Sequence, residues 1–151
     1  MASEKLVLIA SDHAGISLKA ELKNNLVEWT WIDLGPTGSE KVDYPDFAQL
    51  LAKAVISQNA PRGILICGTG IGMSIAANKV PGIRAAVIEN PLSARLSREH
   101  NDLNVLCLGT KILAPEYTLE IVKIWLSTPF SEDARHRKRI EKIHSLERIP
   151  L

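Results

Sequence analysis

The stretch GILICGTGIGMSIAANK, residues 63–79, contains the change of pattern that decides the fold. Its first five residues are apolar without interruption, which is typical of a parallel strand covered on both faces. Three glycines alternate with Thr69 and Ile71 directly after this run, and a helix rich in small residues is predicted over Met73–Lys79. A buried strand, a tight glycine turn and a helix together make one β–α unit.

The same alternation of short apolar runs and longer amphipathic segments continues on both sides of this stretch. Further strands are predicted over Leu6–Ser11, Trp31–Leu34, Arg84–Ile88 and Val105–Leu108. Further helices are predicted over Ile16–Glu28, Phe47–Ile56, Pro91–Asn101, Pro115–Leu126 and Glu132–Leu146. Proline opens two of these helices, at the position where it is favoured. Five β–α units with short connections predict an α/β protein with a doubly wound parallel sheet.

Length and charge limit the function classes. The chain has 151 residues, which favours a single domain over residues 1–151 and leaves no room for separate cofactor and substrate domains. Its net charge of +1 predicts no overall field that would attract nucleic acid or an anionic membrane. The charge is nevertheless uneven, because residues 135–148 hold six basic and two acidic side chains, whereas residues 1–134 hold twelve and fifteen. A basic tail therefore follows a mildly acidic body.

The N-terminal sequence and the cysteines argue against secretion. The opening residues, MASEKLVLIASDH, lack the architecture of a signal peptide, and the longest uncharged stretch, residues 63–78, is too short to span a bilayer. Cys67 and Cys107 lie forty positions apart and suggest no disulfide framework. The four histidines show no zinc-ligand spacing. We expect a cytoplasmic protein with no structural metal.

The glycine loop is a candidate site for an anion. Ligands of doubly wound sheets bind beyond the carboxyl ends of the strands, and backbone N–H groups at a helix start attract negative charge. A P-loop is excluded, because Met73 and Ser74 follow the last glycine. A dinucleotide fingerprint would need glycine at position 73, although Glu89 at the end of the next strand offers a ribose ligand. A nucleotide-binding regulatory module and a turn without a ligand therefore stay open as alternatives.

Cys67 adds chemistry to this loop. It is the last residue of the buried strand, directly before a helix start, where the helix dipole favours the thiolate form. With the Thr69 hydroxyl and the loop amides beside it, the thiolate becomes a base next to an oxyanion site, which suits proton abstraction alpha to a carbonyl. The alternative is a small core residue without chemistry, and this description fits Cys107 better.

Three other polar groups have both a structural and a functional interpretation. Asp12 is either a helix N-cap or, with His13, part of a site at the end of the first strand. His100 either interacts with a helix dipole or acts as an acid–base group. Arg135 and Arg139, four residues apart on one helix face, suit a phosphate dianion but also an ordinary solvated face. One basic cluster on an acidic body supports nucleic-acid binding poorly.

Seven motifs occur in the order of a known family: SDHAG (11–15), VDYP (42–45), ICGTGIGMSIAANK (66–79), GIRAA (82–86), SREHND (97–102), NVL (104–106) and RHRKRI (135–140). With them the chain resembles type B ribose-5-phosphate isomerases, in the sugar-phosphate isomerase family that includes galactose-6-phosphate isomerase subunits. The resemblance covers essentially the whole chain. It implies a Rossmann-like α/β/α sandwich with a five-stranded parallel sheet and a basic C-terminal helix. It also implies cytoplasmic homodimers, sometimes tetramers, with active sites built from both subunits and no metal or organic cofactor.

The resemblance assigns the proton transfers. Cys67 is expected to move the C2 proton of the open-chain sugar, and Thr69 to stabilise the enediolate. His100, together with Asp12, is expected to open the furanose ring. The backbone amides expected to support the enediolate belong to Gly68, Gly70, Ile71 and Gly72.

The resemblance also assigns the binding residues. Tyr44 and Asn101 are expected to contact sugar hydroxyls, and Asp43 to line the same pocket. His13 is expected to bind the phosphate together with the basic tail. The tail residues expected there are Arg135, His136 and Arg139.

Two positions depart from the family pattern. Leu92 stands where many relatives have tyrosine, and Lys111 where arginine is common. Lysine replaces a planar, bidentate group by a point charge, so the departure concerns the phosphate contact and leaves the proton-transfer residues unchanged. The expected reaction is the interconversion of ribose 5-phosphate and ribulose 5-phosphate in the pentose phosphate pathway. Isomerisation of a hexose 6-phosphate of the allose or galactose type is the alternative, because a sequence does not define cavity length.

Overall fold

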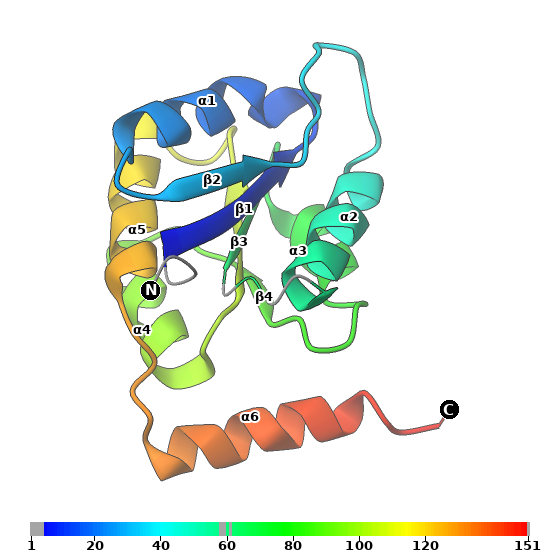
Figure 1. Ribbon diagram of the computed structural model, residues 1–151, viewed down its shortest axis with the longest axis vertical. Helices are drawn as coiled ribbons and strands as arrows, with labels where there is room; N and C mark the ends of the chain where they lie inside the picture. Colours follow the sequence, from blue (N-terminus) through cyan, green and yellow to red (C-terminus); the bar gives the residue numbers. More distant parts are fainter. Residues whose placement is uncertain (1–4, 58–59, 61, 151) are drawn as a thin grey trace.

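The computed structural model describes residues 5–57, 60 and 62–150, which contain one parallel sheet with helices on both faces (Figure 1). The strands in order along the sheet are β2, β1, β3, β5 and β4. Their bounds are β1 Leu6–Ser11, β2 Thr30–Asp33, β3 Gly63–Cys67, β4 Ala85–Val87 and β5 Val105–Gly109. The predicted α/β fold with a doubly wound parallel sheet is confirmed.

Each strand is followed by a helix, and a further helix ends the chain. The helices are α1 Ile16–Asn25, α2 Tyr44–Ser57, α3 Ile71–Ala77, α4 Pro91–Asn101, α5 Pro115–Ser127 and α6 Ala134–Leu146. A 3₁₀ turn, η2 (His13–Gly15), precedes α1. The described residues include no helix of the length and apolar character needed to cross a membrane.

The strand order puts the fully buried strand β5 in the interior of the sheet. The chain leaves β3 through α3, reaches the edge as β4, and returns as β5 between β3 and β4. All residues of β5 are buried, whereas those of β4 are half-buried. A strand that is apolar on both faces is stabilised most with neighbours and helices on every side, which accounts for the position of β5.

Alternate side chains of the strands build two cores. One set, which includes Ile9, Ile64 and Leu106, packs with α1, α4 and α5. The other set, which includes Leu65 and Cys107, packs with α2 and α3. Successive residues of a strand point to opposite faces, so uninterrupted apolar runs such as GILIC supply both layers.

Two helices begin earlier than the sequence predicts. α2 starts at Tyr44, three residues early, because Pro45 fits a first helical turn, where its missing N–H has no helical partner. α3 starts at Ile71, two residues early, because Gly70 completes the glycine turn in the left-handed conformation, with φ of 77°. Both shifts place a residue expected in a loop on a first helical turn beside the glycine loop.

Two other helix boundaries lie inside the predicted ranges. α1 stops at Asn25, three residues early, because Leu26 leaves the helical conformation, with φ of −117° and ψ of 57°. α6 starts at Ala134, two residues late, because the Asp133 carboxylate accepts a hydrogen bond from the Arg135 N–H and caps the helix. The remaining boundaries agree to within two residues, which is the usual uncertainty of helix and strand ends.

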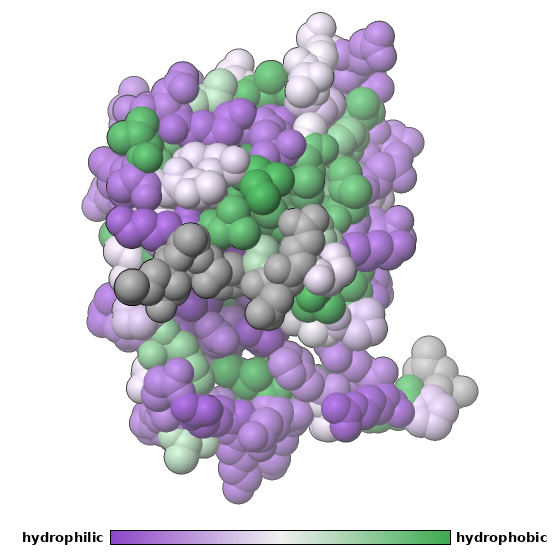
Figure 2. Space-filling view, viewed as in Figure 1, coloured by the Kyte–Doolittle hydropathy of each residue, from purple (hydrophilic) through white to green (hydrophobic). Residues whose placement is uncertain are grey.

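Helix α6 lies apart from the two helix layers, below the body in Figure 1. Its principal helix contact is with α4, and among its side chains only His136 is buried. In the space-filling view the surface of α6 is mostly hydrophilic (Figure 2). The basic tail found in the sequence is therefore a separate, solvent-facing element.

Candidate active site

A cleft opens at the carboxyl edge of the sheet, around the glycine loop. Its volume is about 430 Å³. Parallel strands bring their carboxyl ends to the same edge, so segments far apart in the sequence meet here. The lining residues are Asp12, Tyr44, Cys67, Gly68, Thr69, Ile71, Gly72 and Ile75. Seven of these eight were predicted as site residues, and Ile75 was not.

The glycine turn points a backbone N–H at the Cys67 sulfur. The Gly70 nitrogen donates to Cys67 Sγ over 3.1 Å, and the cysteine side chain is nearly buried, with 5% of its surface exposed. Only glycine suits position 70, because its φ is positive and a Cβ there would lie 3.1 Å from the Leu108 backbone. The sulfur thus sits beside a donor that favours negative charge, at the wall of an open cleft.

Thr69 and Tyr44 shape the rest of this wall. The Thr69 hydroxyl oxygen accepts a hydrogen bond from the Ile71 N–H over 3.3 Å, which holds it at the start of α3. The Tyr44 ring lies against Gly72 so closely that a Cβ at position 72 would be 2.4 Å from ring carbon Cζ. The third glycine of the loop is therefore needed for the close approach of α2 and α3 beside the cleft.

Asp12 caps a turn and also lies at the cleft, so its predicted functional role stays a prediction. Its Oδ1 accepts a hydrogen bond from the Ala14 N–H over 2.9 Å, which caps the turn η2. The same residue lines the cleft next to Cys67. The turn at the end of β1 thus holds this carboxylate at the wall of the cleft.

Charged and polar side chains surround the mouth of the cleft. The exposed His13 accepts a bond at Nδ1 from the Val42 N–H over 3.4 Å, which links η2 to the loop before α2, where Asp43 is also exposed. The Lys111 side chain lies alongside Gly68 in space, because a Cβ at position 68 would be 3.5 Å from Lys111 Cε. Lys111 thus adds a positive charge beside the glycine loop. In the sequence it stood out only as a departure from the family pattern.

The second cysteine has a different environment. Cys107 is fully buried within β5, and burial raises the pKa of its thiol well above the usual range, with a further contribution from nearby Cys67. It stays a neutral thiol among apolar neighbours. Its interpretation as a core residue is confirmed.

The remaining predicted residues lie at the opposite end of the sheet, near the amino ends of the strands. His100 and Asn101 end α4, which begins after β4 at the carboxyl edge and returns to where β5 begins. The rings of His100 and His136 have centroids 4.3 Å apart, so this end of α4 meets α6. Within one chain, the structure therefore separates His100 and Asn101 from Cys67.

Helix α6 presents its basic side chains beside this second group. Arg135 and Arg139 are exposed and line a surface groove of about 410 Å³ together with Lys138 and Lys142. His136, by contrast, is 5% exposed, and its Nδ1 lies 2.8 Å from the Ser131 hydroxyl. Its ring packs inward against α4, and its contact with phosphate stays a prediction. The predicted residues at the end of α4 and on the exposed face of α6 are called here the α4–α6 half-site (His100, Asn101, Arg135, Arg139).

Metal ligation has no evident place in either group. Within residues 5–57, 60 and 62–150, no three His, Cys, Asp or Glu side chains lie together in a way that could hold a metal ion. The chemistry available to the cleft is that of a thiol, a hydroxyl, a carboxylate and backbone amides.

Comparison with known proteins gives a consistent result. Residues 7–143 match the family model described as Ribose/Galactose Isomerase. Ribose-5-phosphate isomerase B of Escherichia coli is 46% identical over 145 residues, which cover 95% of this chain and 97% of the relative. The structure of Clostridium thermocellum ribose-5-phosphate isomerase B has a TM-score of 0.90 and 50% identity, covering 95% of this chain and 97% of that one. That of the Mycoplasma genitalium enzyme with bound ribulose 5-phosphate has a TM-score of 0.90 and 40% identity, with coverage of 96% and 97%.

Proposed function

The chain belongs to the ribose/galactose isomerase family, and from this membership we propose that it is an aldose–ketose isomerase interconverting D-ribose 5-phosphate and D-ribulose 5-phosphate. The observation that carries the proposal is the N–H···S bond from Gly70 to Cys67 at the wall of an open cleft. It holds a sulfur base next to a row of backbone amides, which is what enediolate chemistry needs.

Cys67 is the base in the proposed reaction. Its thiolate takes the proton from C2 of the open-chain aldose, and the electrons of that C–H bond form a C1=C2 double bond while the oxygen on C1 becomes negative. Thr69 and the loop amides stabilise this oxygen. Transfer of the O2 proton to the negative oxygen on C1, and return of the proton from Cys67 to C1, give the ketose with its carbonyl at C2. The reaction consumes no oxidant, reductant or cofactor.

His100 is the acid–base group for ring opening, and it reaches Cys67 only from a second copy of the chain. Ring opening protonates the ring oxygen and removes the proton of the C1 hydroxyl, which an imidazole near neutral pH can do. Within one chain, Cys67 lies at the carboxyl end of the strands and His100 lies near their amino ends. We therefore propose a homodimer in which the α4–α6 half-site of one subunit completes the cleft of the other.

The surfaces for this dimer are apolar. A groove of about 530 Å³ lies between β4, α4 and α6, with mostly apolar walls that include Ile83, Leu96 and Ile143. The isoleucines Ile71 and Ile75 stand out from α3 beside the cleft, 56% and 59% exposed. Seating α3 of one subunit in the groove of the other would bury these isoleucines and bring Asn101, which lines the groove, toward the partner's cleft. A two-fold axis makes both sites of the dimer identical.

A substrate panel tests the proposed function. The purified protein is assayed with ribose 5-phosphate, allose 6-phosphate and galactose 6-phosphate, and kcat/KM is compared. The highest value is expected for ribose 5-phosphate. A higher value for either hexose phosphate assigns the enzyme to the alternative substrate, and no turnover of any of the three, with binding of NAD, overturns the isomerase assignment in favour of a nucleotide-binding module.

The proposed reaction also has a place in the cell. Sugar phosphates of this kind belong to the pentose phosphate pathway, and we place the enzyme in the cytoplasm. Both cysteines are free, which is typical of proteins in a reducing compartment.

A further inference from the structure

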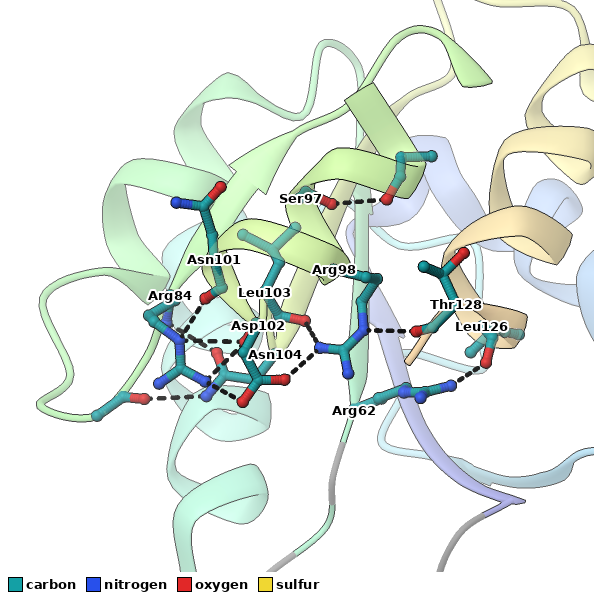
Figure 3. Close-up of polar contacts among 12 residues, drawn as sticks. Arg62, Arg84, Ser97, Arg98, Asn101, Asp102, Leu103, Asn104, Leu126 and Thr128 are labelled. Atoms are coloured by element: carbon teal, nitrogen blue, oxygen red, sulfur yellow. Dashed lines mark hydrogen bonds and ion pairs between the residues drawn. The ribbon is translucent and has the colours of Figure 1, made fainter. Parts of the chain in front are cut away.

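The end of helix α4 is held by a cluster of arginines behind His100 and Asn101. Asp102 follows the helix in the left-handed conformation, with φ of 45°, which is uncommon for a residue other than glycine. Its carboxylate receives Arg98 Nη1 at 2.9 Å and Arg84 Nη2 at 3.2 Å. Figure 3 shows both arginines converging on Asp102, with the Asn101 side chain pointing away from them. The backbone that carries the predicted sugar-binding groups is thus fixed from behind.

Arg84 holds this backbone directly. Its Nε donates to the carbonyl oxygens of Asn101 at 3.0 Å and Asp102 at 3.1 Å, and its Nη2 donates to the Asp102 carbonyl at 2.6 Å. Burial lowers the pKa of Arg84, while the Asp102 carboxylate acts in the opposite direction. Arg84 is itself anchored, because its backbone N–H donates to Oδ1 of Asn104, the residue before β5, over 2.8 Å.

The same guanidinium reaches α6. Arg84 Nη1 lies 2.9 Å from His144 Nε2, and because a guanidinium can only donate, the imidazole nitrogen accepts. A second tie lies nearby, where the Gly82 N–H donates to Glu147 Oε1 over 2.8 Å. The segment before β4, part of the GIRAA motif, therefore anchors the C-terminal turn of the helix that carries Arg135 and Arg139.

From these contacts we propose that Arg84 is a positioning residue of the isomerase. It fixes the distance and orientation between the ring-opening group at the end of α4 and the phosphate-binding face of α6. The inference rests on the proposed function, in which these two elements act on the same substrate molecule. It assigns a task to the GIRAA motif and to the aspartate of SREHND, which no step of the proposed chemistry uses.

Four variants test this inference. Arg84→Met removes every hydrogen bond of the guanidinium and keeps a long side chain, Arg84→Lys retains one donor, and His144→Leu breaks only the tie to α6. Arg62→Met is the matched control, because Arg62 is a half-buried arginine whose contacts are with Trp29, Trp125 and the Leu126 carbonyl. Thermal midpoints and circular dichroism report folding for each protein.

Two activity measurements distinguish a positioning role of Arg84 from a role in folding alone. Conversion of ribose 5-phosphate requires ring opening, whereas exchange of a C1 proton of ribulose 5-phosphate with D₂O requires the Cys67 thiolate and the enediolate-stabilising groups of the cleft but no ring opening. In Arg84→Met, we expect kcat for ribose 5-phosphate to fall about 10- to 100-fold and KM to rise, because a displacement near 1 Å has effects of this size. Exchange at saturating ribulose 5-phosphate should stay within about threefold of wild type, in line with an unchanged cleft.

Each of the other variants should change fewer of these kinetic constants, or change them less, than Arg84→Met does. His144→Leu should raise KM about 3- to 10-fold with kcat unchanged, since one net hydrogen bond is lost. Arg84→Lys should recover part of kcat, and Arg62→Met should lower the thermal midpoint and leave both constants unchanged.

Each other outcome contradicts the inference. Unchanged kcat and KM in Arg84→Met show that the contact has no positioning role, and parallel loss of turnover and exchange shows a purely structural one. If Arg84→Met does not fold, normal constants in both Arg84→Lys and His144→Leu overturn the inference. A wild-type protein that neither isomerises nor exchanges overturns the proposed function itself.

Discussion

The two cysteines differ in their contacts and in their position relative to the cleft. Both end up in the same sheet, and both lie among apolar strand residues. Cys67 faces a cleft and receives the Gly70 N–H, whereas Cys107 is enclosed by the core, where burial raises the pKa of its thiol. The position of each sulfur relative to the strand end decides which of them lies at the cleft, and only Cys67 is placed to act as the proposed base.

Replacement of Cys67 tests the base directly. Cys67→Ala should lower kcat for ribose 5-phosphate by at least about 10²-fold, the range of a lost general base, while phosphate binding and the fold persist. Turnover and proton exchange in D₂O measure the chemistry, and the thermal midpoint measures the fold. Cys107→Ala is the matched control and should keep the wild-type kcat per folded molecule. Near-normal turnover by Cys67→Ala would assign the base to another group.

At the level of elements, a carboxylate at the end of β2 ties the sheet edge to α1. Asp33 Oδ1 lies 2.8 Å from Lys19 Nζ and Oδ2 lies 2.6 Å from Lys23 Nζ. Burial on its own would raise the pKa of Asp33, but the hydrogen bonds from both lysines and from the Gly35 N–H lower it below its ordinary value. The Lys19 side chain is almost fully buried, so its charge depends on this partner.

Asp33→Asn should therefore lower the free energy of unfolding at pH 7 by about 2 kcal/mol, the range for hydrogen bonds to charged groups. A depressed pKa in the folded state contributes stability that is present above the unfolded pKa and is lost as the pH falls through the folded pKa. The difference between wild type and variant should thus be full at pH 7 and shrink below about pH 4. Urea unfolding at both pH values measures it, and a difference independent of pH would contradict the assigned ion pairs.

Helix α6 allows a second test at this level. Arg139→Ala should raise KM about 10- to 100-fold and leave kcat nearly unchanged, because a phosphate contact is made equally in the ground and transition states. Arg137→Ala is the control, since Arg137 is paired with Glu132 and does not line the basic groove. Steady-state kinetics with ribose 5-phosphate decide between them. Equal KM values for the two variants would remove Arg139 from the phosphate site.

At the level of the whole molecule, the two groups of predicted site residues lie at opposite ends of the strands of one sheet. In a β–α unit the helix carries the chain back to the edge where its strand began, so the end of α4 cannot lie beside the end of β3. The apolar groove beside β4 and the exposed isoleucines of α3 are the surfaces assigned to the proposed dimer. The proposed shared site predicts that activity requires a dimer.

Mixing two inactive variants tests the shared site. Cys67→Ala and His100→Ala subunits, unfolded together and refolded in equal amounts, should regain about a quarter of wild-type activity. Half of the dimers are then mixed, and each of these has one intact site out of two. Each variant refolded alone is the control and should stay inactive. No recovery, in a mixture shown to contain mixed dimers, would place Cys67 and His100 in the same subunit's site.

Much of this arrangement could be read from local patterns. The runs LVLIAS, GILIC and NVLCLG predicted strands because uninterrupted apolar segments need cover on both faces, and Pro91 and Pro115 marked helix starts. The cleft around Cys67 was also predictable, because strand ends meet at one edge of a parallel sheet. Ile75 was missed at the cleft, since an apolar residue on a short helix has no distinctive local signal, and Lys111 beside Gly68 was noticed only through the family resemblance.

The sequence by itself determined the elements and the glycine turn and singled out Cys67 as the candidate base, because each depends on residues that are neighbours along the chain. The tertiary structure alone decided the strand order, the burial of His136 against His100, and the contacts of Arg84 with the ends of α4 and α6. These features join segments as much as sixty residues apart, and their energies depend on which surfaces remain uncovered after the sheet has formed. For the same reason, the basic tail binds phosphate in the proposed way only when the cleft of a second subunit faces it.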